Sequence, residues 1–186
     1  RFDENSALAE LNRSGRLSGA PDELLEVVAA ARRLGATSHG AFDVTVQPVI
    51  DLLRARRAAG QLGAPVEAEL SEALARTGLG RLRLRGRGPE LAGDGMGVTR
   101  DGIAKGFVVD RIAATLSAHG VRDCLINAGG DVRTAGTRDG SSPWRVAVRD
   151  PDRRDRPAAL VAAESGAIAT SGGYEIFFDD EGICHH

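Results

Sequence analysis

Residues 101–131 read DGIAKGFVVDRIAATLSAHGVRDCLINAGGD, and the other segments of the chain are organised around this stretch. Apolar residues recur at short helical intervals between Phe107 and Leu116, which predicts a helix with one buried face. The apolar run at residues 124–126 predicts a short strand, and the glycines that follow it would let a ligand approach the backbone closely. This stretch therefore predicts a ligand site built from polar residues at the ends of packed elements.

Polar side chains of this stretch are candidates for ligand contacts. Lys105 opens the predicted helix, where the helix dipole disfavours a positive charge, so we expect a nearby anion, either Asp101 or a bound phosphate. A surface lysine is an equally good interpretation of Lys105. Asn127 and Asp131 flank the Gly-Gly turn; an Asx-turn would explain either residue alone, whereas both at one strand end favour a ligand site.

Polar residues outside this stretch allow two interpretations each. A second polar turn, ATSGGY at residues 169–174, carries hydroxyl and N–H groups that suit a pyrophosphate or a ribityl chain, although a bulged hairpin is the structural alternative. Asp43, Thr45 and Gln47 either face a ligand or cap the helix that follows them. The histidine pair at residues 185–186 is either the remnant of an affinity tag or the start of a catalytic segment.

Length and composition restrict the class of protein. The chain has 186 residues, of which 42% are hydrophobic, as expected for one domain with a real core. The net charge is −2, and no basic face with interleaved aromatic residues is present, which argues against nucleic-acid binding. No apolar run is long enough to span a membrane. We therefore expect a single domain that does not bind nucleic acid.

Hydrophobic periodicity predicts that helices come first and strands later, which favours an α+β fold over a doubly wound parallel sheet. A glycine at position 35 is expected to stop the second helix, and Gly120 the helix of the central stretch. Residues 164–166 are expected to form a hairpin turn. Besides the central elements, we expect helices at residues 6–12, 21–34, 46 or 48 to 59 and 71–76, and strands at 82–85, 144–149, 159–163, 166–170 and 174–178.

The order of the motifs is more specific than any one of them. GAFDVTVQPV, DGIAKGFVVDR, LINAGGDVRTAG, WRVAVRDP, AIATSGGYEIFF and GICHH follow one another, and this order resembles the FAD:protein FMN transferases, the ApbE-type flavin transferases. The resemblance extends from residue 6 to the last residue. It implies an α+β domain, related to the T-fold, in which N-terminal helices pack on a mainly antiparallel or mixed sheet.

The resemblance implies a reaction and its participants. In this family a Mg²⁺-dependent transferase cleaves FAD, attaches FMN through a phosphoester bond to a threonine of a target flavoprotein, and releases AMP. The target carries a motif of the D-x-x-[ST]-G-A-T kind, and the product is a covalently flavinylated protein. Other members hydrolyse FAD to FMN and AMP, and a flavin-binding protein without catalysis is the alternative from another class.

The resemblance also implies roles for individual residues. The backbone carbonyl of Gly102 is expected to bind Mg²⁺. His185 and His186 match the catalytic histidine segment of the family, with His186 as the general base for the acceptor threonine. The expected FAD-site residues are Lys105, Asn127, Gly129, Gly130, Asp131, Thr170, Ser171 and Gly172.

The sequence departs from the family pattern in ways that affect the metal. Residues 98–101 read VTRD where the family has Leu-Asp-Leu-Gly. The family also supplies an aspartate and a threonine as metal ligands after the histidine segment, and neither position is in this sequence. We therefore expect residues 1–186 to be one flavin-transferase domain that lacks its N- and C-terminal segments. A bacterial protein is expected, either cytoplasmic or exported and membrane-anchored, with any anchor located before Arg1.

Overall fold

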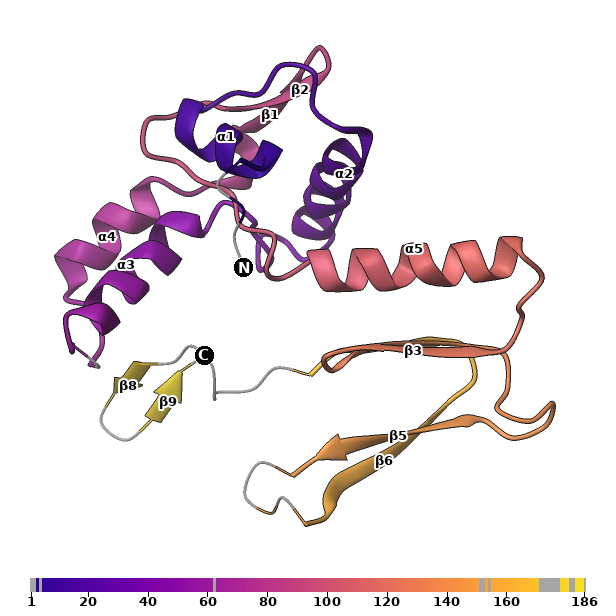
Figure 1. Cartoon of the computed structure of the whole chain (residues 1–186). Coiled ribbons are helices and arrows are strands. Elements are labelled where there is room, and N and C mark those ends of the chain that lie inside the picture. The colour runs from indigo at the N-terminus through magenta and orange to yellow at the C-terminus, as the bar shows by residue number, and fades with distance from the viewer. Residues whose placement is uncertain are drawn as a thin grey trace. The chain divides into compact units, whose positions relative to one another are not determined.

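The computed structural model describes residues 3, 5–61, 63–150, 153, 155–170, 178–180 and 183–185. The chain forms two compact units. The first unit comprises Arg1–Ile103 together with Phe178–His185, and the second comprises Ala104–Phe177 together with the last residue. Figure 1 labels the elements of both units along the chain.

The first unit begins with the helices that the periodicity predicts. Ser6 caps helix α1, because its Oγ accepts a hydrogen bond from the Ala9 N–H at 3.2 Å, and Gly15 ends the helix at φ 73°. Helix α4 begins before the predicted position, and the other predicted starts are confirmed to within a few residues. The helices are α1 (Ala7–Ser14), α2 (Asp22–Thr37), α3 (Gln47–Ala58) and α4 (Glu67–Ala75).

Gly35 does not stop α2, which continues to Thr37, so that prediction is wrong. A Cβ atom on Gly35 would lie 2.0 Å from Cδ2 of Leu79 and 3.0 Å from the carbonyl oxygen of Phe42. The position therefore needs glycine because other segments pack directly against the helix backbone, and not because the helix ends there.

A two-stranded antiparallel hairpin completes the core of the first unit. A short 3-10 turn, η1 (Leu79–Arg81), leads into β1 (Leu82–Arg85), which pairs with β2 (Gly88–Leu91). Strand β2 was not predicted, because its first two residues are glycine and proline, which are depleted in strands. Helices α1 and α2 contact β2, and the buried core residues are Leu11, Val28, Ala31, Val44, Leu82, Leu91, Met96, Val98 and Ile103.

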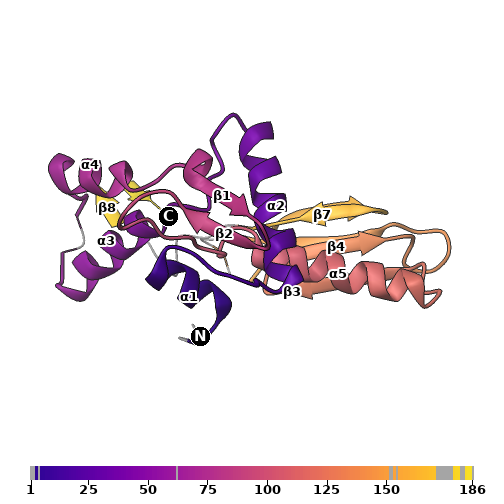
Figure 2. The same ribbon diagram turned by 90° about the horizontal axis from the view of Figure 1, so that it is seen from above.

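The second unit places helix α5 (Ala104–Ala118) against a three-stranded antiparallel sheet. Figure 2 shows the helix running along the two strands β3 (Cys124–Ala128) and β4 (Asp131–Ala135). The sheet order is β3-β4-β7, where β7 is Gly166–Ile168. Gly120 follows the helix at φ 83°, as predicted.

The expected hairpin turn at residues 164–166 is wrong. Strand β6 (Pro157–Ala163) pairs with β5 (Trp144–Arg149), whereas β7 pairs with β4, so the turn carries the chain from one sheet to another. A Ser-Gly turn is compatible with both arrangements, and the choice depends on which strand lies alongside each segment.

Strand β8 (Phe178–Asp180) pairs antiparallel with β9 (Ile183–His185), and most of the strand predicted at 174–178 lies outside the described residues. All the strand pairs described are antiparallel, apart from an isolated parallel bridge between Val46 and Gly97. The α+β class is confirmed. Among the described residues, no helix has the length and apolar character needed to cross a bilayer.

Candidate functional site

The second unit brings together the predicted ligand-site residues of the Gly-Gly turn. Gly129 and Gly130 adopt φ values of 64° and 99°, which L side chains rarely tolerate. The Asn127 Oδ1 accepts a hydrogen bond of 3.0 Å from the Gly130 N–H, so the Asn127 side chain closes the turn. We call the group that surrounds this turn the turn cluster: Lys105, Asn127, Gly129, Gly130, Asp131 and Thr170.

Thr170 reaches the turn from a segment 40 residues further along the chain. Its hydroxyl donates a hydrogen bond of 3.4 Å to the Gly130 carbonyl. A Cβ atom added to Gly130 would lie 2.7 Å from Thr170 Oγ1, so a larger residue would crowd this hydroxyl. The structure therefore places Thr170, from the second polar segment, in contact with Gly130 of the Gly-Gly turn.

The anion beside Lys105 is Asp131. The Lys105 Nζ lies 3.4 Å from the Asp131 Oδ1, and the side chains are 54% and 20% exposed respectively. Asp101, the partner considered from sequence, instead faces Arg54, with a distance of 3.6 Å between the Nη2 and Oδ2 atoms. Asp131 offsets the unfavourable position of a cation in the first turn of α5.

A second ion pair joins the same helix to the same strand. The Arg133 Nε on β4 lies 3.6 Å from the Asp110 Oδ1 on α5. Asp131 and Arg133 alternate with the buried residues Val132 and Thr134, so they share the sheet face that α5 covers. Two ion pairs of opposite polarity thus join α5 and β4, one at the Gly-Gly turn and one beyond it.

Part of the predicted site lies outside the described residues. These predictions concern Ser171, Gly172 and His186, and they stay predictions. His185 pairs with Phe178 in the β8–β9 register, but its side chain is not among those described. Gly102 belongs to the first unit, two residues before α5, where an added Cβ atom would lie 3.2 Å from the Phe42 ring.

The described residues do not form a magnesium site by themselves. They contain no group of three or more His, Cys, Asp or Glu side chains that could hold a metal ion. Two carboxylates next to the predicted glycine turns, Asp101 before Gly102 and Asp131 after Gly130, each face a basic side chain. Mg²⁺ needs near-octahedral oxygen coordination, which the Gly102 carbonyl alone would not supply. The metal role of Gly102 stays a prediction.

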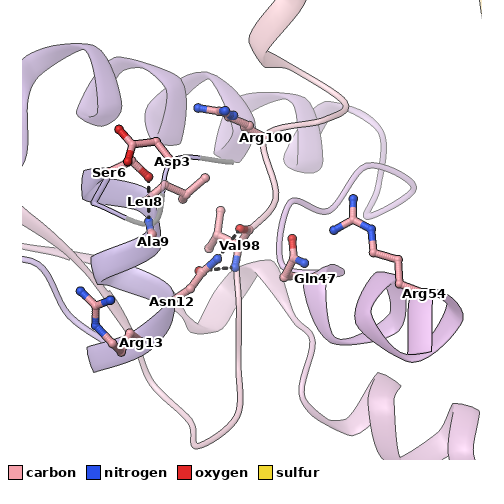
Figure 3. A pocket seen from close by; sticks show the side chains of 10 residues that line it. All are labelled: Asp3, Ser6, Leu8, Ala9, Asn12, Arg13, Gln47, Arg54, Val98 and Arg100. Atoms are coloured by element: carbon pink, nitrogen blue, oxygen red, sulfur yellow. Dashed lines mark hydrogen bonds between the residues drawn. The ribbon is translucent and has the colours of Figure 1, made fainter. Parts of the chain in front are cut away.

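The first unit contains a cavity of about 390 Å³ that sequence reasoning missed (Figure 3). Asn12 connects two of its walls, because its Nδ2 donates to the Val98 carbonyl at 2.9 Å and its Oδ1 accepts from the Val98 N–H at 2.8 Å. No sequence signal could have located this cavity, because its walls come from three separate segments. It is lined by Asp3, Ser6, Leu8, Ala9, Asn12, Arg13, Gln47, Arg54, Val98 and Arg100.

Asp43 and Thr45 hold the backbone and do not face this cavity. The Asp43 carboxylate accepts hydrogen bonds from the N–H and hydroxyl of Thr45, both at 2.7 Å, and from the Leu79 N–H at 2.9 Å. The Thr45 hydroxyl, in a fully buried residue, accepts a further bond from the Gly78 N–H at 2.7 Å. Of the three residues considered from sequence, Gln47 alone lines the cavity.

Comparisons with known proteins agree with the family that the motif order indicates. The model of the ApbE family matches residues 1–186. The chain belongs to the ApbE family. It is 30% identical to a Salmonella typhimurium protein named FAD:protein FMN transferase, over 97% of this chain and 54% of that protein. A Vibrio cholerae protein of the same name is 33% identical, over 87% of this chain and 48% of that protein.

Solved structures of ApbE proteins show the same fold. The crystal structure of the Thermotoga maritima ApbE protein matches with a TM-score of 0.84 and 30% identity, covering all of this chain and 60% of that one. A structure of the Vibrio cholerae flavin transferase ApbE matches with a TM-score of 0.74 and 29% identity, over 92% of this chain and 56% of that one. The chain spans about half the length of the curated relatives it matches.

Proposed function

We propose that this ApbE-family chain is the FAD-binding part of an FAD:protein FMN transferase. The observation that carries the proposal is the turn cluster, in which Lys105, Asn127 and Thr170 surround a glycine turn. Relatives named FAD:protein FMN transferase match almost the whole chain and support the choice of flavin chemistry. In this proposal residues 1–186 act as one domain together with further segments of the protein.

The turn cluster suits the pyrophosphate of FAD. Phosphoryl transfer mainly requires positioned donors and charges around the phosphates, and the turn cluster offers one ammonium group, that of Lys105. Gly129 leaves the backbone accessible, since nothing lies within 4 Å of a Cβ atom built on it. Ser171 and Gly172 extend this site in the proposal.

The proposed reaction transfers a phosphoryl group between two oxygens. The hydroxyl oxygen of an acceptor threonine, in a D-x-x-[ST]-G-A-T type segment, attacks the FMN phosphorus, and a new O–P bond forms. The bond from this phosphorus to the bridging oxygen breaks, and AMP leaves with that oxygen. His186, assisted by His185, takes the proton of the threonine hydroxyl. Mg²⁺ dependence is part of the proposal, with ligands beyond the Gly102 carbonyl supplied from outside the described residues.

The direct test replaces Lys105. Lys105→Ala should weaken FAD binding by about 1.5–3 kcal/mol if its ammonium contacts the phosphates. Arg32→Ala is the matched control, since Arg32 is an exposed cation on α2 in the other unit. FAD affinity is measured by the quenching of flavin fluorescence. An unchanged affinity would return Lys105 to the role of a surface residue.

Product analysis separates the transferase from the related activities. With FAD, Mg²⁺ and a protein carrying the acceptor threonine, a transferase releases AMP and leaves FMN on the acceptor. Free FMN beside AMP would indicate an FAD pyrophosphatase, and FAD binding without AMP would indicate a binding protein. His186→Ala, in a protein that includes both flanking segments, should slow transfer by about 10²–10⁴-fold while FAD binding stays nearly intact.

A further inference from the structure

Lys105 is the only lysine in this chain, and the other side chains with a permanent positive charge are all arginines. An ammonium group is a compact point charge that rotates freely, whereas a guanidinium group is a planar fork. The single ammonium group is located in the first turn of α5, beside the Gly-Gly turn, with its side chain 54% exposed. This cation is therefore open to solvent at the place where we propose that the phosphates bind.

Asp131 faces this cation from the first position of a strand. It is the first residue of β4, the central strand of the sheet, and it pairs with Ala128 of β3. Its side chain is only 20% exposed, and its Oδ1 lies 3.4 Å from the Lys105 Nζ. A phosphate that approaches Lys105 therefore also approaches the negative charge of Asp131, which repels it.

The repulsion depends on the charge of the ligand. A free pyrophosphate meets the full effect of the Asp131 carboxylate, whereas a pyrophosphate that carries a divalent cation has less negative charge to be repelled. We take this cation to be bound to the pyrophosphate when it arrives, and no cluster of metal ligands lies among the described residues. Asp131 can thus discriminate between the two forms without itself binding the metal.

We propose that Asp131 is a specificity-determining residue, a charge gate that pairs with Lys105 when no ligand is bound and disfavours phosphate anions that arrive without a divalent cation. The gate rests on the proposed function, since it requires phosphates at the turn cluster. It also makes a prediction that a simple ligand-holding role for Asp131 does not make: removal of its charge should tighten the binding of cation-free pyrophosphate.

The chain contains a matched control for this charge. Asp110 belongs to the second ion pair between α5 and β4, where its Oδ1 lies 3.6 Å from the Arg133 Nε. Asp110→Asn removes one carboxylate from the same helix–strand interface but leaves the pair of Lys105 and Asp131 in place. Asp131→Asn removes the carboxylate that faces Lys105 and keeps the shape of the side chain.

The experiment uses inorganic pyrophosphate as the probe and the methyl groups of Lys105 as the reporter. Reductive methylation with ¹³C-formaldehyde labels Lys105 and the N-terminal amine, keeps the charge of the amine, and yields one lysine signal. The shift of this signal during titration measures pyrophosphate binding at Lys105, with and without Mg²⁺. Circular dichroism establishes that each variant is folded.

Removal of the Asp131 charge should change the affinity for pyrophosphate in a defined direction and by a defined amount. At low ionic strength, Asp131→Asn should bind Mg²⁺-free pyrophosphate about tenfold more tightly than the unmodified protein. The gain should shrink in high salt, because salt screens exposed charges. In the unmodified protein Mg²⁺ should strengthen pyrophosphate binding, and in Asp131→Asn it should do so less. Asp110→Asn should match the unmodified protein in both respects.

The outcomes separate the gate from the proposed function. Unchanged or weaker pyrophosphate binding in Asp131→Asn, with a normal shift of the Lys105 signal, would overturn the gate alone. In the unmodified protein, which needs no variant to fold, failure of Mg²⁺ to strengthen binding would also overturn it. Pyrophosphate that leaves the Lys105 signal unmoved in every protein would overturn the placement of the phosphates and the gate with it.

Discussion

Gly130→Ala tests whether the close approach of the two polar turns exists in solution. Gly130 has a φ of 99°, and a Cβ atom there would lie 2.7 Å from Thr170 Oγ1. A left-handed conformation costs an alanine about 1–2 kcal/mol, and this φ lies beyond the left-handed minimum near 57°. The contact adds to that cost unless the threonine side chain moves. We expect Gly130→Ala to lower the free energy of unfolding by about 2–3 kcal/mol.

Gly129→Ala is the matched control for this substitution. Gly129 has a φ of 64°, close to the left-handed minimum, and nothing lies within 4 Å of an added Cβ atom. Its replacement should cost only about 1 kcal/mol. The difference between the two variants therefore measures the contact with Thr170 together with the less favourable backbone angle.

A double substitution separates these two contributions. Measured against Thr170→Ala alone, Gly130→Ala should lose the contact part of its cost, because the crowding oxygen is absent, and keep the backbone part. Urea denaturation followed by circular dichroism measures the free energy of unfolding of the unmodified protein, the three single variants and the double variant. Amide hydrogen exchange of residues 124–135 localises the effect. If Gly130→Ala cost no more than Gly129→Ala, Thr170 would not confine the turn, and the close approach would be refuted.

Three further predictions concern other parts of the molecule. Asn12→Ala should lower the free energy of unfolding by about 1–3 kcal/mol, because backbone groups across the cavity lose bonds of 2.8 and 2.9 Å; urea denaturation with no measurable change would contradict this. Asp43→Asn should lower the free energy of unfolding by a similar amount, about 1–3 kcal/mol, because the new amide nitrogen would face an N–H or O–H donor. An unchanged midpoint of urea unfolding would argue against the hydrogen bonds of Asp43. Hydrogen bonds from Ser142, and to a smaller extent from Ser141, hold the pKa of Asp139 well below its usual range. The ionised Asp139 carboxylate therefore stabilises the folded protein above the unfolded-state pKa, and this stabilisation is lost as pH falls through the folded-state pKa. A ¹³C NMR titration of the aspartate carboxyl carbons should find Asp139 still ionised at the pH at which exposed aspartates are half protonated. A titration midpoint of Asp139 in the usual range would refute the lowered pKa.

Local features were predictable because they depend on a few neighbouring residues. Ser6 at the start of α1 and Gly120 after α5 mark helix ends by capping and by backbone freedom, and both act where the sequence indicated. The alternating WRVAVR segment forms β5 as predicted. The Gly-Gly turn was recognisable for the same reason, since its positive φ angles require residues without a Cβ atom.

The choice of partners was decided by the tertiary structure. Gly35 lies within α2 because Leu79 packs against its backbone, which no residue near position 35 reveals. Lys105 faces Asp131, 26 residues away in the chain and not the nearby Asp101, because the β3–β4 hairpin returns the chain beneath the start of α5. Likewise β7 pairs with β4 and not with its neighbour β6. Short-range propensities act through the local backbone, whereas a strand, a buried glycine or an exposed cation receives its partner from whichever distant segment the completed fold places beside it.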